Sequence, residues 1–100
     1  MNMLNSVILE GNIKGYTKNS EFIDFIMASS RYSMNENNER IETITEVTCR
    51  VFGEMVKACE RCIQFGRGVR VVGRLAGSDG KIILVAEQLE WKLSHLKKEA

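Results

Sequence analysis

One stretch of helical periodicity, residues 55–63, interrupts a chain whose other regular segments alternate with the period of a β-strand. Met55, Cys59 and Ile63 share one side of this stretch and polar side chains share the other, which predicts an amphipathic helix of about three turns. Gly66 follows in the place of a C-terminal cap, because glycine adopts the left-handed conformation at least cost. A lone helix among strands strongly limits the architectures available to the chain.

The predicted strands share a high content of β-branched and aromatic side chains, bounded by Gly, Asn, Ser and Asp. Their ranges are 5–13, 21–33 and 44–52 before the helix, and 69–75 and 81–91 after it. The third strand has the clearest alternation, because Val47, Cys49 and Val51 point to one side while Glu46, Thr48, Arg50 and Phe52 point to the other. We expect the first set inside and the second set outside.

Three polar segments are predicted to connect these strands. Residues 12–15 suit a short connection after the first strand, and the asparagine-rich residues 34–40 suit a solvated hairpin tip. The Ser-Asp-Gly sequence at 78–80 predicts a tight hairpin between strands four and five.

Three strands, one helix and two strands is the element order of the OB-fold. The sequence therefore predicts an all-β protein, a five-stranded OB-fold Greek-key barrel with one α-helix between strands three and four. A chain of 100 residues closes a single core. We expect one domain at 1–93, followed by a short polar extension at 94–100. The outer face of strands two and three of such a barrel is available for binding oligomers.

Composition gives weaker indications of function. The formal net charge of +1 does not by itself indicate a nucleic-acid partner, so the positions of the charges must carry that argument. Three cysteines and an N-terminus without the pattern of a secretory signal favour reduced thiols and a cytoplasmic location. The apolar runs are shorter than the roughly 20 residues that cross a bilayer, so no membrane partner is expected.

Several segments, in this order along the chain, resemble the bacterial single-stranded DNA-binding proteins. They are NSVILEGNIKG at 5–15, FIMASSRY at 25–32, EVTCRVFGEMVKAC at 46–59, FGRGVRVVGRLA at 65–76 and DGKIILVAEQLEW at 79–91. The resemblance implies an OB-fold core that uses no cofactor and binds single-stranded DNA in replication, recombination and repair. It also implies a homotetramer, with a dimer as the alternative.

The sequence departs from that family in three places. The family often carries an aromatic residue early in strand three, where this chain has Glu46, and another in the loop between strands four and five, which here is shortened to GSDG. The family also continues into a flexible tail with an acidic tip that recruits replication proteins, whereas this sequence ends in LSHLKKEA. Recruitment through such a tip is therefore not expected.

Single strands are bound without sequence preference by aromatic rings that stack on bases and cations that follow the phosphates. Phe52 is the first candidate, since alternation places it beside Arg50 on the outer side of strand three, and the family has an aromatic at this point. Tyr32 lies near another stacking position of the family, with a packing role as the alternative. The candidate phosphate contacts are Lys14, Lys18, Arg31, Arg50, Arg70, Arg74 and Lys81.

The remaining aromatic residues are expected to pack inside the barrel or at its end: Phe22, Phe25, Phe65 and Trp91. Cys59 and Cys62 form a CxxC pair, but a structural zinc site needs four ligands and a second such pair is missing. Both thiols are expected to be buried and inert on the apolar side of the helix.

No catalytic arrangement is predicted, because His95 has no evident nucleophile or carboxylate beside it. The leading hypothesis is a non-enzymatic, sequence-tolerant binder of single strands. An OB-fold module that acts mainly by docking proteins, as a replication-restart accessory, is the alternative, and a thiol redox enzyme is a third possibility.

Overall fold

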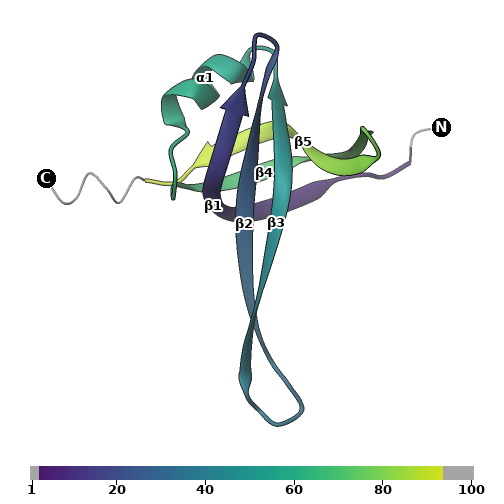
Figure 1. Ribbon diagram of the computed structural model, residues 1–100. Helices are drawn as coiled ribbons and strands as arrows, with labels where there is room; N and C mark the ends of the chain where they lie inside the picture. Colours follow the sequence, from purple (N-terminus) through teal and green to yellow (C-terminus); the bar gives the residue numbers. More distant parts are fainter. Residues whose placement is uncertain (1–2, 94–100) are drawn as a thin grey trace, which may run out of the picture.

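The computed structural model describes residues 3–93, which form a closed five-stranded barrel with one helix (Figure 1). The elements are β1 (Val7–Lys18), β2 (Phe22–Met34), β3 (Arg40–Phe52), α1 (Met55–Cys62), β4 (Gly68–Ser78) and β5 (Lys81–Trp91). Around the barrel the strands follow the order β1-β2-β3-β5-β4, with β3 and β5 parallel and the other neighbours antiparallel. This is the OB-fold that the sequence predicts, with the helix between β3 and β4.

β1 belongs to two sides of the barrel. Residues 7–12 pair with β4 and residues 12–18 pair with β2, and the register of the second ladder shifts between Ile13 and Gly15. An extra residue in one strand bends that strand and increases its twist. The prediction that the strand ends at 12–15 is therefore wrong: the chain bends at this point but remains a strand through Lys18.

Two glycines allow neighbouring strands to approach closely, Gly11 of β1 against β2 and Gly73 of β4 against β5. A Cβ atom on Gly11 would lie 2.3 Å from the carbonyl oxygen of Ala28, and one on Gly73 would lie 2.0 Å from that of Val85. Both distances are far inside van der Waals contact. Closure of the barrel at these two points requires a residue without a side chain.

The helix is shorter than predicted. α1 has eight residues, or about two turns, and ends because Ile63 takes an extended conformation with φ −73° and ψ 128°. Gly66 has the expected left-handed φ of 85°, but it lies in the turn that leads into β4 and does not cap the helix. The tight hairpin at 78–80 is confirmed, since both Asp79 and Gly80 have positive φ, as a two-residue turn requires. No helix in residues 3–93 is long and apolar enough to cross a bilayer.

The core is filled by alternate residues of all five strands and by one face of α1. Its largest fully buried side chains are Phe25, Ile13, Ile23, Met27, Leu84, Val51, Val69 and Val71. Cys49 and Val51 are buried, as the alternation of strand three predicts, and Trp91 packs at the edge of this cluster. Phe22 and Phe65 are not core residues: Phe22 points to the outer side of β2, and Phe65 is 68% exposed in the turn before β4.

β2 and β3 continue past the barrel as a twisted two-stranded arm, residues 29–45, that ends in the polar turn at 35–39 (Figure 1). In the turn, the side-chain oxygen of Asn35 accepts hydrogen bonds from the backbone amides of Asn37 and Glu39. The ladder between the two strands runs without a shift from Phe22–Phe52 to Met34–Arg40. A regular ladder keeps the outward-facing residues on one face of the ribbon, and that face rotates with the twist of the arm.

Replacing Gly73 with alanine is expected to destabilise the fold by about 1–3 kcal/mol, the range for forcing extra volume into a packed site. The new methyl group would collide with the backbone of Val85. Gly77→Ala is the matched control on the same strand, because a Cβ atom there meets nothing within 4 Å. Thermal or urea unfolding of the two variants checks the expectation, and equal stability would contradict the role given to Gly73.

Candidate nucleic-acid interface

The ladder between β2 and β3 divides their side chains into two sets. Ile23, Phe25 and Met27 alternate with residues that point away from the core, and each outward residue of β2 faces an outward residue of β3. We call the outward set the β2–β3 face. It comprises Phe22, Asp24, Ile26, Ala28, Ser30, Tyr32 and Met34 with their partners Phe52, Arg50, Thr48, Glu46, Ile44, Glu42 and Arg40. At roughly 3.3 Å per residue, the face is about 40 Å long.

One end of this face carries an aromatic pair. Phe22 and Phe52 are cross-strand partners, with ring centroids 5.7 Å apart and an edge-to-face angle of 66°. Phe52 is 46% exposed, so the outward orientation predicted from alternation is confirmed. Phe22 is half-buried beneath it, and the sequence analysis missed this residue. The available signal was its spacing of three from buried Phe25, which gives the two rings opposite orientations on a strand.

Arg50 lies against this aromatic pair and is held in place by several partners. Its guanidinium carbon is 4.1 Å from the centroid of the Phe22 ring. Nε and Nη2 donate to the two carboxylate oxygens of Asp24 at 2.8 and 2.9 Å, and Nη1 donates to the Ser78 hydroxyl at 3.3 Å. The hydrogen bonds to Asp24 raise the pKa of Arg50. The guanidinium is therefore fixed as a flat surface over Phe22.

A second aromatic–cation contact lies on the arm. The guanidinium carbon of Arg40 is 4.0 Å from the centroid of the Tyr32 ring, and Tyr32 is 54% exposed. A hydrogen bond with Glu42 raises the pKa of the Tyr32 hydroxyl, and Ser30 donates to the same carboxylate. Sequence analysis did not identify Arg40, because its position diagonal to Tyr32 depends on the hairpin register.

The candidate cations do not all lie on one side of the protein. Arg50 is on the β2–β3 face, whereas Arg31 is on the opposite side of the arm from Tyr32 because consecutive residues alternate. Four of the seven are paired with carboxylates. The pairs are Lys18–Glu60 at 3.0 Å, Arg50–Asp24 at 2.8 Å, Arg70–Glu10 at 2.7 Å and Arg74–Glu87 at 3.4 Å.

Three candidate cations have no carboxylate partner within residues 3–93: Lys14, Arg31 and Lys81. Lys81 pairs with Ser78 across the β4–β5 hairpin, and the hydroxyl of Ser78 contacts Arg50, so this hairpin lies beside the aromatic end of the β2–β3 face. The face itself carries the anions Asp24, Glu42 and Glu46 against Arg40 and Arg50. It is consequently not a strongly basic surface.

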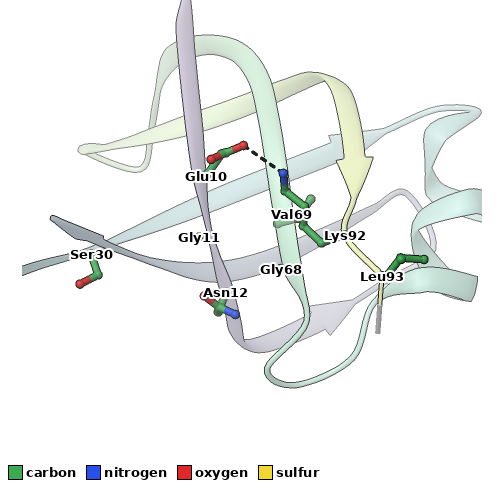
Figure 2. Close-up of a pocket in the computed structure, with 8 residues that line it drawn as sticks. All are labelled: Glu10, Gly11, Asn12, Ser30, Gly68, Val69, Lys92 and Leu93. Carbon is green, nitrogen blue, oxygen red and sulfur yellow. Dashed lines mark ion pairs between the residues drawn. The ribbon is translucent and has the colours of Figure 1, made fainter. Parts of the chain in front are cut away.

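A cleft of about 350 Å³ lies between β1, the start of β4 and residues 92–93, and it borders the β2–β3 face at Ser30 (Figure 2). Glu10 of β1 and Lys92, which follows β5, point toward each other across it and form an ion pair at 3.2 Å. Arg70 also donates to Glu10, and these contacts lower the pKa of Glu10. The Asn12 amide donates to the backbone oxygen of Gly66. Glu10, Asn12 and Lys92 already have hydrogen-bond or ion-pair partners in the protein. The cleft therefore does not indicate a particular ligand.

The thiols do not form a site. No group of three or more His, Cys, Asp or Glu side chains with the arrangement of a metal site occurs in residues 3–93. Cys59 is fully buried as predicted, while Cys62 is only half-buried. Desolvation raises the pKa of Cys59 to about 11 and that of Cys49 to about 12. His95 lies outside the described residues.

These features define an OB-fold barrel with an exposed aromatic face on β2 and β3. Comparison with protein-family models and with curated protein sequences gives no match. Among solved structures, the fold is that of single-stranded DNA-binding proteins and of PriB. A deletion mutant of the Thermus aquaticus single-stranded DNA binding protein matches with a TM-score of 0.77 at 19% identity, over 92% of this chain and 52% of that one. This chain thus spans about half the length of the Thermus protein.

Two further structures match over nearly their whole length. The Plasmodium falciparum SSB in complex with ssDNA has a TM-score of 0.76 at 16% identity, over 92% of this chain and 97% of that one. PriB from Ralstonia solanacearum has a TM-score of 0.75 at 16% identity, over 89% and 98%. The resemblance seen in the sequence is confirmed at the level of the fold.

The thiols are expected to differ sharply in reactivity at pH 8. Cys49 and Cys59 should label slowly in the folded protein, because their raised pKa values leave almost no thiolate at that pH and burial blocks access. Cys62 should label first. Titration with a chromogenic disulfide reagent, with Cys62→Ser as the control, checks this expectation. Three equally fast thiols would contradict it and revive the redox alternative.

Proposed function

We propose that the protein binds unpaired nucleic acid, single-stranded DNA in particular, along the β2–β3 face and performs no chemistry on it. The observation that carries the proposal is the exposed ring of Phe52, which packs edge-to-face against Phe22 while Arg50 lies over the Phe22 ring. Tyr32 and Arg40 lie toward the other end of the same face. Every base presents a flat π-surface, so stacking on such rings tolerates any sequence. A similar fold has been solved with ssDNA in the Plasmodium protein.

The phosphates would be contacted by the unpaired candidates Lys14, Arg31 and Lys81, and by cations whose present ion pairs are exposed. Exposed pairs contribute little, typically 0–1 kcal/mol, so a phosphate can replace the carboxylate at small cost. Lys18, Arg70 and Arg74 belong to this second group, with side chains 43–56% exposed. A role in replication, recombination or repair is part of the same proposal.

A second candidate function is a protein-docking accessory module. It is supported by the match to PriB over almost that protein's whole length and by the mixed charge of the β2–β3 face. Under this alternative Phe52 would be a protein contact. The experiment below separates the two, because docking alone predicts no dependence of DNA affinity on Phe52.

Phe52→Ala is expected to weaken binding of a labelled oligo-dT by about 1–3 kcal/mol, the cost of losing one stacked base. The affinity of the unaltered protein should also fall as salt rises, because neutralised phosphates release counterions. Fluorescence anisotropy at two salt concentrations measures both effects.

Phe65→Ala is the matched control, since Phe65 is an exposed ring outside the β2–β3 face. Its affinity should equal that of the unaltered protein. Absence of binding at low salt by a protein that is folded by circular dichroism would refute the proposed function. An unchanged affinity in Phe52→Ala would favour the docking alternative.

A homo-oligomer is also proposed, a tetramer or a dimer, on the basis of the exposed first strand. Residues 7–11 of β1 pair with β4 on one edge, and the ladder to β2 on the other edge begins only at Asn12. Ile8 on this segment is 69% exposed. An unpaired strand edge is a ready template for a second copy.

Light scattering should therefore give a mass that is a multiple of 11.3 kDa. Ile8→Lys should reduce it to the monomer, because charge on a strand edge opposes pairing. A mass of 11.3 kDa for the unaltered protein at micromolar concentration would refute the oligomer.

A further inference from the structure

We propose that Asp24 is a positioning residue that withholds Arg50 from phosphates, so that a strand bound at this end of the β2–β3 face turns its bases, rather than its backbone, toward Phe52 and Arg50. The inference rests on the proposed function and deepens it, since it states which side of the strand the site recognises. It assigns Arg50 a stacking role in place of the phosphate contact expected from the sequence.

The hydrogen bonds of Arg50 already use three of its N–H groups. A guanidinium has five N–H donors. Two donate to Asp24 in a bidentate pair and a third donates to the Ser78 hydroxyl. Bidentate pairing with a carboxylate is the same geometry that arginine uses for a phosphate. Asp24 therefore occupies the position where a phosphate would bind most strongly.

The charges around Arg50 also disfavour a phosphate. Asp24 already balances its charge, and Asp79 of the β4–β5 turn is close enough to contribute to the raised pKa of Arg50. The side chains of Arg50 and Asp24 are 20% and 23% exposed, so solvent screens this pair less than the other ion pairs of the surface. A phosphate at this point would have to displace one carboxylate and approach another.

The same contacts prepare Arg50 for a base. The guanidinium plane is held over Phe22, and Phe52 presents its exposed ring from the adjacent cross-strand position. Nucleobases stack on arginine planes as well as on aromatic rings. The cluster thus offers two flat surfaces of low net charge side by side, which suits bases better than a polyanionic backbone.

A matched pair elsewhere on the barrel provides the control. Arg74 and Glu87 form a single contact at 3.4 Å, with side chains 50% and 52% exposed, on β4 and β5. Asp24→Asn and Glu87→Gln each remove one negative charge and free one arginine. They therefore change the overall charge equally but differ in whether the freed arginine lies beside the aromatic pair.

The first measurement is the salt dependence of binding to oligo-dT and to an abasic oligomer of the same length. Asp24→Asn should steepen the slope of log affinity against log salt by about 0.7, the contribution of one additional phosphate contact on a single strand. It should also raise the affinity for the abasic oligomer. Glu87→Gln should leave the slope equal to that of the unaltered protein, because Arg74 already exchanges its exposed carboxylate for a phosphate.

The second measurement uses Arg50→Lys, which retains the charge and can still pair with Asp24 but loses the flat surface. Its affinity for oligo-dT should fall about fivefold or more, the lower end of the loss of one stacked base. Its affinity for the abasic oligomer should stay unchanged, and Arg61→Lys, at an exposed arginine of α1 outside the β2–β3 face, should alter neither. Circular dichroism establishes that each variant is folded.

The outcomes separate this inference from the proposed function. If the unaltered protein binds oligo-dT but Asp24→Asn and Glu87→Gln have equal slopes, or Arg50→Lys binds oligo-dT as well as the unaltered protein, the inference is overturned and the proposed function stands. If the unaltered, folded protein binds neither oligomer, both are overturned.

Discussion

The barrel depends on β1 being hydrogen-bonded to two neighbours, to β4 through its first half and to β2 through its second. The bulge at residues 13–15 supplies the bend. Gly11 allows the close approach of β1 to β2, and Gly73 that of β4 to β5. The pairing of β2 with β1 ends at Ala28, so beyond this residue β2 is hydrogen-bonded only to β3. They extend from the body as a paired ribbon (Figure 1).

The β2–β3 face runs without interruption from the barrel onto the arm. The β2–β3 ladder has no shift, so Tyr32 and Arg40 on the arm belong to the same face of the ribbon as Phe22 and Phe52 on the barrel. The inward set changes from buried to exposed residues where the barrel ends. The proposed binding face therefore continues beyond the barrel onto the arm.

Charge on this protein is arranged in local pairs rather than as a basic field. Most of the candidate cations lie beside a carboxylate, and the β2–β3 face carries three anions against two cations. Such a surface gives weak electrostatic steering. Binding by stacking, with phosphates held by a few scattered lysines and arginines, is consistent with the near-neutral net charge of the chain. The half-buried Asp24–Arg50 pair is the clearest example of this local neutralisation.

The sequence by itself determined the element order, the closed barrel with its helix, and the orientation of Phe52 and Cys49, because a period of two assigns each residue of a strand to one side. The same rule, applied to Phe22, would have corrected its placement in the core. The tertiary structure alone decided that residues 12–15 bend instead of turning, that Arg50 is held by Asp24, and that Arg40 covers Tyr32. Those features depend on the register, which is the pairing of residues between two strands. The sequence of one strand alone does not specify it.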